Sequence, residues 1–183
     1  MAKRGDVLEN PKTGEKIVFR ETAADTKGEL LRFDFFVNPG GFAPPRHLHT
    51  TLEERVELVS GALRWHLGGK EGSLSPGESV VLPRGVGHTF WNEGPGQAHF
   101  IVDVKPAFDM EALFETIFGL YRDGKTDGRG VPNLLQNAVL SRAYDGFLAG
   151  PPIALQKPVI ATLATVGRLL GYRARYDKYS GPE

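Results

Sequence analysis

The stretch HLHTTLEERVELVSG, residues 47–61, combines histidines with the period of a β-strand. His47 and His49 are two residues apart, so on an extended chain their side chains point to the same side, roughly 7 Å apart. Histidine is scarce here, with 5 in a chain of 183 residues. Two imidazoles on one side of a strand indicate a ligand site, although isolated His-x-His pairs also occur by chance on surface strands.

Two adjacent glutamates follow, and the alternation of the strand distinguishes between them. Glu54 is in phase with Val56 and Leu58, which we expect to face the interior, whereas Glu53 belongs to the outward face. Glu54 is therefore the carboxylate expected to share the interior with the histidines. An unpaired carboxylate is costly to bury, and coordination to a divalent cation removes that cost.

A third histidine, His88, follows the turn PRGVG at residues 83–87. Pro83 stiffens this turn, and Gly85 and Gly87 permit positive φ angles in it. Three imidazoles and one carboxylate form a nitrogen and oxygen donor set that suits Fe, Mn, Co, Ni, Cu or Zn. Because four protein ligands leave two positions of an octahedral ion open, such a site is suited to binding a substrate.

The composition restricts the possible classes of function. Lys+Arg and Asp+Glu both number 22, so no basic field is present to attract nucleic acid or an anionic membrane. The chain has no cysteine, which excludes disulfides and thiolate metal sites. Residues 1–16 lack the apolar stretch of a secretory signal, and the least charged run, residues 158–167, is too short to span a membrane. We expect a cytoplasmic protein with no nucleic-acid partner and no membrane insertion.

The part of the chain before Pro106 is expected to be β-structure. Apolar residues alternate in LLRFDFFV at residues 30–37, and Gly- and Pro-rich turns separate this run from other short ones. Many short strands at this spacing are typical of a sandwich or a barrel. The other predicted strands are residues 55–60, 62–67, 79–82, 88–91 and 99–105.

After Pro106 the apolar spacing lengthens to that of helices. The predicted helices are residues 109–121, 133–148 and 159–170. The apolar face of the third helix is compatible with membrane-surface binding. Packing on the same domain or on a partner subunit is favoured, because basic residues occur only at its end. We expect a β-barrel with N-terminal strands over residues 1–107 and a helical extension over residues 108–183, packed on the barrel or on a partner subunit.

The two histidine-containing segments resemble the two motifs of the cupin superfamily. GFAPPRHLHTTLEERVELVSG fits the first motif at Gly41, His47, His49, Glu54 and Gly61. GESVVLPRGVGHTFWN fits the second motif at Gly77, Pro83, Gly85, His88 and Asn92. The resemblance covers about residues 30–105.

The resemblance implies an all-β jelly-roll barrel, a double-stranded β-helix, followed here by a C-terminal α-helical extension. It identifies His47, His49, Glu54 and His88 as the ligands of a metal inside the barrel, in agreement with the phase argument for Glu54. The expected cofactor is one divalent transition-metal ion: Fe, Mn, Ni, Cu, Co or Zn.

Aromatic side chains are candidates for the walls of a substrate pocket. The expected wall residues are Phe33, Phe35, Phe42, Trp65, Phe90 and Phe100. Few polar side chains other than the ligands are expected to face inward, which favours a small apolar or aromatic substrate whose oxygens meet the metal. The alternative role for these aromatic residues is core packing.

These features together predict a metal-dependent oxidoreductase of the dioxygenase type. A non-catalytic cupin that binds or senses a small ligand and a metal-dependent isomerase are the alternatives. Glu54 is the catalytic candidate, as a carboxylate that takes a proton when it leaves the metal. Of the other histidines, His66 is expected on the outer face, and the sequence leaves the side of His99 open.

We also expect a homodimer. A barrel of this kind has exposed sheet edges that often pair with a second copy. In the first helix, Phe114, Phe118 and Tyr121 either cap the barrel or reach across a two-fold interface.

Overall fold

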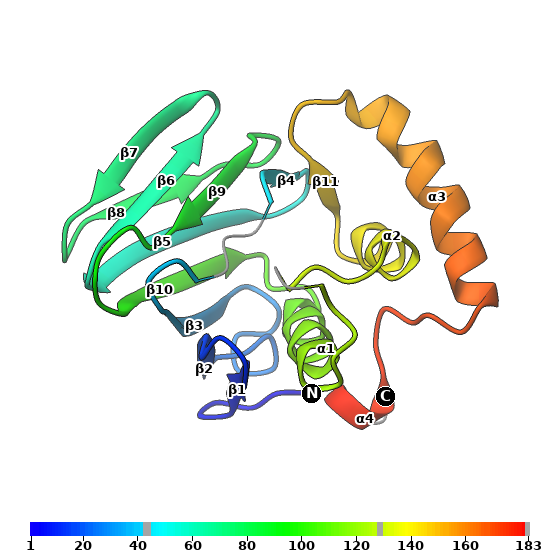
Figure 1. Cartoon of the computed structure of the whole chain (residues 1–183), viewed down its shortest axis with the longest axis horizontal. Helices are drawn as coiled ribbons and strands as arrows, with labels where there is room; N and C mark the ends of the chain where they lie inside the picture. The colour runs from blue at the N-terminus through cyan, green and yellow to red at the C-terminus, as the bar shows by residue number, and fades with distance from the viewer. Residues whose placement is uncertain (42–44, 128–129, 182–183) are drawn as a thin grey trace.

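The computed structural model describes residues 1–41, 45–127 and 130–181. Two antiparallel sheets face each other, and the helices gather beside their open end (Figure 1). In spatial order, the first sheet contains β1 (Val7–Glu9), β2 (Lys16–Glu21), β3 (Leu31–Val37), β10 (Ala98–Lys105), β5 (Glu53–Ser60) and β8 (Ser79–Leu82). The second contains β11 (Gly146–Leu148), β4 (His47–His49), β9 (His88–Trp91), β6 (Leu63–Leu67) and β7 (Lys70–Leu74). The helices are α1 (Met110–Arg122), α2 (Leu134–Ala143), α3 (Ile153–Leu169) and α4 (Asp177–Ser180).

The alternation predicted for β5 is confirmed. Glu54, Val56 and Leu58 are buried and face the second sheet, whereas Glu53 is exposed. The same period in β3 and β10 places Phe33 and Phe100 in the core between the sheets. The predicted all-β barrel followed by C-terminal helices is therefore the observed architecture.

The prediction of a helix over the whole of residues 133–148 was wrong in its last part. α2 ends at Ala143, Asp145 adopts a φ of 54°, and the chain continues as β11. β11 pairs antiparallel with β4, with Gly146 opposite His49 and Leu148 opposite His47. The open edge of β4 offers hydrogen-bond partners that no local sequence pattern reveals, so tertiary pairing overrides the helical spacing.

The third helix is longer than the sequence predicts. α3 starts at Ile153, whereas the predicted helix starts at residue 159, and α3 contains Pro158. A proline inside a helix removes one backbone hydrogen bond and does not necessarily end the helix. Pro158 is exposed, so its ring lies on the solvent side. β7 was not among the predicted strands; it starts at Lys70, directly after Gly68 and Gly69, which take positive φ angles.

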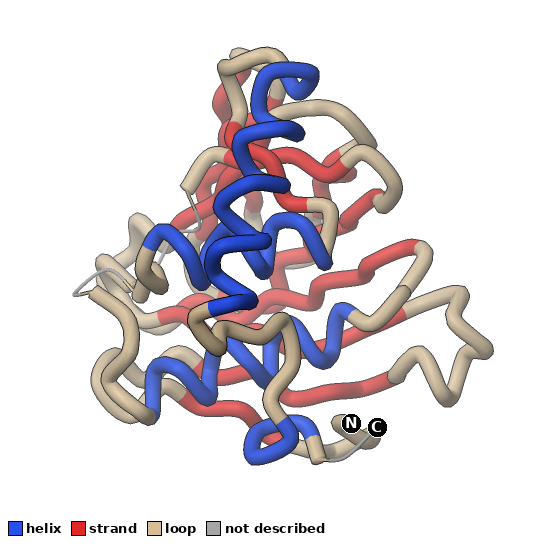
Figure 2. Tube along the Cα trace, turned by 90° about the vertical axis from the view of Figure 1, so that its right-hand side faces the viewer, coloured by secondary structure: helices blue, strands red, loops and turns tan. Residues whose placement is uncertain are grey.

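The helical extension packs directly on the barrel. Phe114 of α1 meets Phe33 of β3 edge-to-face, with 4.8 Å between ring centroids, and Phe118 and Tyr121 belong to the same core. α2 lies beyond α1, and α3 runs over the outside of α2 with its outer side uncovered (Figures 1 and 2). No helix in the described part of the chain is long and apolar enough to cross a membrane.

Candidate metal centre

Residues from both sheets converge in the interior of the barrel. His47 and His49 lie on β4, and His88 lies on β9 directly opposite His47. Glu54 approaches from β5 in the other sheet. The period of two brings the side chains of His47 and His49 to the same side, and the turn at residues 83–87 places His88 at the start of its strand.

The three imidazoles form a compact cluster. The ring centroids of His47 and His88 are 4.5 Å apart, and those of His47 and His49 are 5.0 Å apart. One nitrogen from each ring lies within 4.8 Å of the other two. Two nitrogen ligands on opposite sides of one ion are roughly 4.2 Å apart, so the cluster is close to the size that a single ion spans.

The other nitrogen of each imidazole is bound to a backbone carbonyl. His47 Nδ1 lies 2.8 Å from Pro45 O, His49 Nδ1 lies 3.1 Å from Asp145 O, and His88 Nδ1 lies 3.0 Å from Val86 O. A carbonyl oxygen only accepts hydrogen bonds, so each Nδ1 carries the proton and donates. In the neutral ring, each Nε2 then presents a lone pair, which is the arrangement of histidines that bind metals.

The buried environment keeps these rings neutral. Burial, together with the neighbouring imidazoles of His88 and His49, lowers the pKa of His47 to about 3. Burial likewise lowers the pKa of His49 and the pKa of His88. Glu54 is also buried, and burial raises the pKa of its carboxyl group.

The carboxylate of Glu54 faces two of these lone pairs without a hydrogen bond. Its Oε1 lies 3.7 Å from His49 Nε2, and its Oε2 lies 3.6 Å from His88 Nε2. His88 Nε2 is buried and has no hydrogen-bond partner. Acceptors therefore point at acceptors in a site shielded from water, and a cation between them would satisfy all of them. The donor set thus fits a divalent transition-metal ion.

Asp145 connects the extension to β4. Its carboxylate accepts hydrogen bonds from the backbone N–H and the hydroxyl of both Thr50 and Thr51, at distances of 2.6 to 2.8 Å. Burial alone would raise the pKa of Asp145, but these hydrogen bonds outweigh it and lower the pKa. Because its carbonyl also holds His49 Nδ1, Asp145 positions the strand that carries the histidines. Asp145 was not predicted as a functional residue, although the Asp-Gly pair at 145–146 is a turn signal.

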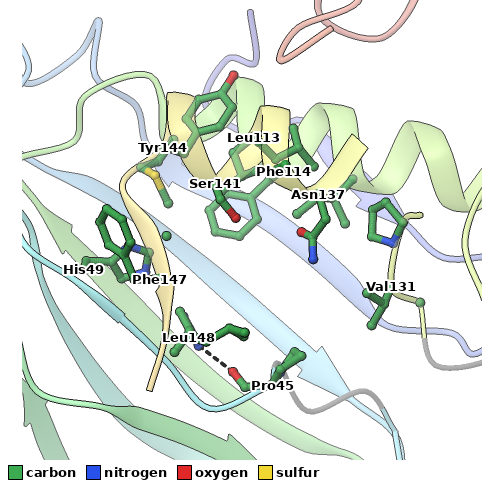
Figure 3. Close-up of a pocket in the computed structure, with 18 of the residues that line it drawn as sticks. Pro45, His49, Leu113, Phe114, Val131, Asn137, Ser141, Tyr144, Phe147 and Leu148 are labelled. Carbon is green, nitrogen blue, oxygen red and sulfur yellow. Dashed lines mark hydrogen bonds between the residues drawn. The ribbon is translucent and has the colours of Figure 1, made fainter. Parts of the chain in front are cut away.

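A cavity of about 430 Å³ opens beside the cluster and runs between the barrel and the helices. His47, His49 and Glu54 border it from the barrel side. Figure 3 shows Leu113 and Phe114 of α1, Asn137 and Ser141 of α2, and Phe147 of β11 around it. The walls are mostly apolar, so the cavity favours an apolar ligand whose polar end reaches the cluster.

Some of the predicted wall residues border the cavity, and others pack in or against the core. Phe33, Phe35 and Phe90 border the cavity. Phe100 is fully buried behind Phe35 and Phe90, with ring centroids 5.2 and 5.3 Å away. Trp65 packs against the core and is not among the described residues that border the cavity. Phe42 lies outside the described residues.

The remaining histidines lie elsewhere. His66 is buried, although its strand position is on the same face as the half-exposed Arg64. His99 Nε2 lies 2.6 Å from Asp34 Oδ1, and the His99 ring stacks on Phe36. His99 is not one of the described residues that border the cavity.

Residues 33–104 match the family model described as Cupin domain. This segment of the chain is a cupin domain. The residues of the cluster, at positions 47, 49, 54 and 88, all lie within the matched cupin segment. Cupins commonly bind a divalent metal, and the cluster of His47, His49 and His88 could hold one.

Comparison with known proteins gives one curated relative and several similar structures. An oxidoreductase from Arthrobotrys oligospora is 26% identical over 155 residues, which cover 76% of this chain and 60% of that protein. A predicted oxalate decarboxylase from Thermotoga maritima is 17% identical with a TM-score of 0.50, and the match covers 58% of this chain and 99% of that chain. KdgF from Halomonas sp. is 21% identical with a TM-score of 0.48 over 56% of this chain and 89% of that chain. At 17% identity, the Thermotoga maritima structure shows the fold alone.

Asp145→Ala is predicted to lower the free energy of unfolding by at least about 2 kcal/mol, because it leaves the N–H and hydroxyl groups of Thr50 and Thr51 without their charged acceptor. Asp145→Asn is the matched variant. It tolerates the positive φ angle, it keeps one acceptor oxygen, and the threonine hydroxyls can turn to accept from its amide. Urea unfolding should therefore show a clearly smaller loss for asparagine. Equal stability of wild type and Asp145→Ala would contradict the stabilising role of the hydrogen bonds from Thr50 and Thr51 to Asp145.

Proposed function

We propose that this cupin is a metal-dependent oxidoreductase of the dioxygenase type, acting on a small apolar or aromatic substrate that carries oxygen donors. One observation supports the proposal above others. A buried set of acceptor atoms, suited to a transition-metal ion, lies at one side of a mostly apolar cavity.

The residues proposed to hold the ion are His47, His49 and His88, through their Nε2 atoms, and Glu54, through its carboxylate. A bound transition-metal ion would supply Lewis acidity and, where it is redox-active, electron transfer to O2. Fe, Mn, Ni, Cu, Co and Zn all accept this donor set. The backbone carbonyls that hold each Nδ1 would fix the orientation of the rings.

Glu54 is the proposed proton acceptor for the substrate. Among the described residues that border the cavity, the carboxylates are Glu15 and Glu54. The carboxylate of Glu15 accepts hydrogen bonds from the side chains of Asn10 and Thr13. The carboxylate of Glu54 lies 3.7 Å from His49 Nε2 and 3.6 Å from His88 Nε2, too far for a hydrogen bond to either. Glu54 thus lies at the position where a phenol or enol oxygen would meet the cluster.

The walls would orient the substrate. Phe33, Phe35, Phe114 and Phe147 border the cavity and would limit the access of water to a bound substrate. Since polar side chains are few along these walls, the oxygens of a substrate gain most by facing the ligand cluster. The apolar body of the substrate would then lie between the barrel and α1.

The curated relative supports only the broad class of reaction. It is named as an oxidoreductase, and this chain spans 60% of its length. The homodimer is a second part of the proposal: the open sheet edges at β1, β8 and β7 and the uncovered side of α3 (Figure 2) are alternative surfaces that a second copy could cover.

Protein purified without added metal should contain close to one equivalent of a first-row ion by elemental analysis. His88→Ala should lower the metal affinity at least 10-fold, because it removes a nitrogen ligand. His66→Gln is the matched control, since this buried histidine lies outside the cluster. Equal metal content in wild type and His88→Ala after identical loading would contradict the assignment of the ligands.

Iron- or copper-loaded protein should consume O2 in the presence of some members of a panel of phenols and diketones. Glu54→Gln should keep the metal and lose roughly 100-fold or more in turnover, which is the scale of general acid–base catalysis. Unchanged turnover would remove Glu54 from the catalytic role. Loaded protein that binds panel members but consumes no O2 would favour the non-catalytic or isomerase alternatives.

A further inference from the structure

The helix α3 is the least covered element of the extension. It packs on α2, where Gly167 lies so close to Leu135 and Val139 that an added Cβ would meet them at 3.0 Å. Ala164 and Gly167 are its buried residues. Figure 2 shows the full length of α3 on the surface, with no other segment of the described chain in front of it.

The exposed side of α3 carries a heptad pattern, which we call the α3 seam. It comprises Leu155, Val159, Thr162, Val166 and Leu169, at alternating spacings of four and three residues. The exposed fractions are 65% for Leu155, 57% for Val159, 42% for Val166 and 83% for Leu169. The hydroxyl of Thr162 donates to Pro158 O at 3.0 Å, so this residue adds no unsatisfied polar group to the seam.

The pattern fits a second helix of the same kind. Valines at the a positions and leucines at d positions favour two-stranded pairing of helices. The residues that flank the seam are uncharged: Gln156, Pro158, Leu163 and Thr165. The amide of Gln156 is used internally, bonding Leu148 N and O at 2.9 Å.

Charge favours a second copy over an anionic lipid surface. The basic residues of α3 are Lys157 and Arg168, at positions f and c of the same heptads, away from the seam. Lys157 lies over the ring of Phe147, 6.0 Å from its centroid. Two seams can therefore meet without bringing like charges together, whereas a lipid-binding helix has basic side chains beside its apolar stripe.

The seam is also continuous with the rim of the cavity. Val159 belongs to the seam and borders the cavity. Leu134 and Leu148, also cavity-lining residues, are 68% and 56% exposed. A partner placed against the seam would cover this apolar rim.

We propose that the α3 seam is the interface of a homodimer, in which the α3 helices of two copies pack together and cover the rim of each cavity. Association of the two copies and access of a ligand to the cavity are thereby linked. The inference rests on the homodimer of the proposed function and uses none of its metal chemistry.

The first test measures the association of wild type and of Val166→Glu. Sedimentation equilibrium should show a wild-type dimer at micromolar concentration and at least a 10-fold weaker dimer for Val166→Glu, which places a charge in the seam. Ala154→Glu is the control, because this exposed residue lies on α3 outside the seam. An unchanged far-ultraviolet circular dichroism spectrum of Val166→Glu would show that the variant is folded and that only association has failed.

The second test uses the absence of cysteine in the chain. Thr162→Cys should form a disulfide-linked dimer under mild oxidation. Thr162 lies midway along the seam, so it is near its counterpart whether the two helices run parallel or antiparallel. Ala154→Cys should not. A monomeric wild type, or a dimer indifferent to Val166→Glu, overturns the interface. The interface is also overturned if the wild type is a monomer that sediments with phosphatidylglycerol vesicles and Val166→Glu no longer sediments with them.

Discussion

The site depends on one constraint: the Nδ1–H of each clustered histidine is bound to a backbone carbonyl. This fixes the tautomer, so the Nε2 lone pairs of His49 and His88 point at the carboxylate of Glu54 at 3.6 to 3.7 Å. Burial opposes the alternative solution, in which the imidazoles take up protons, because it lowers the pKa of each ring. Burial also raises the pKa of Glu54, but a proton on its carboxyl group could satisfy only one Nε2 atom, whereas a cation would satisfy the whole cluster of acceptors.

The C-terminal extension is part of this site and of its barrel. β11 adds a strand beside β4, Asp145 holds Thr50 and Thr51, and Gln156 of α3 satisfies the backbone of Leu148 at the sheet edge. An edge strand left open would expose its hydrogen-bonding groups. The same segments that stabilise the histidine strand therefore also close the apolar cavity next to it.

The local parts of this arrangement could be predicted from the sequence. The period of two placed Glu54 inside the barrel, because burial alternates along any half-buried strand. The histidines were recognised by their spacing and by the two motifs. β11 and the helical wall were not predicted, since strand pairing and cavity walls depend on segments distant in the sequence. Trp65 was predicted as a wall residue but packs against the core, because alternation along a strand does not distinguish a core position from a cavity wall.

The convergence of the four side chains on one ion is tested most directly by X-ray absorption of the cobalt-loaded protein. The account predicts nitrogen and oxygen ligands at about 2.0–2.2 Å, with the outer-shell scattering of three imidazoles. Loss of one imidazole in His49→Ala would confirm the source of that scattering. A shell of oxygen ligands without imidazole scattering would contradict the account.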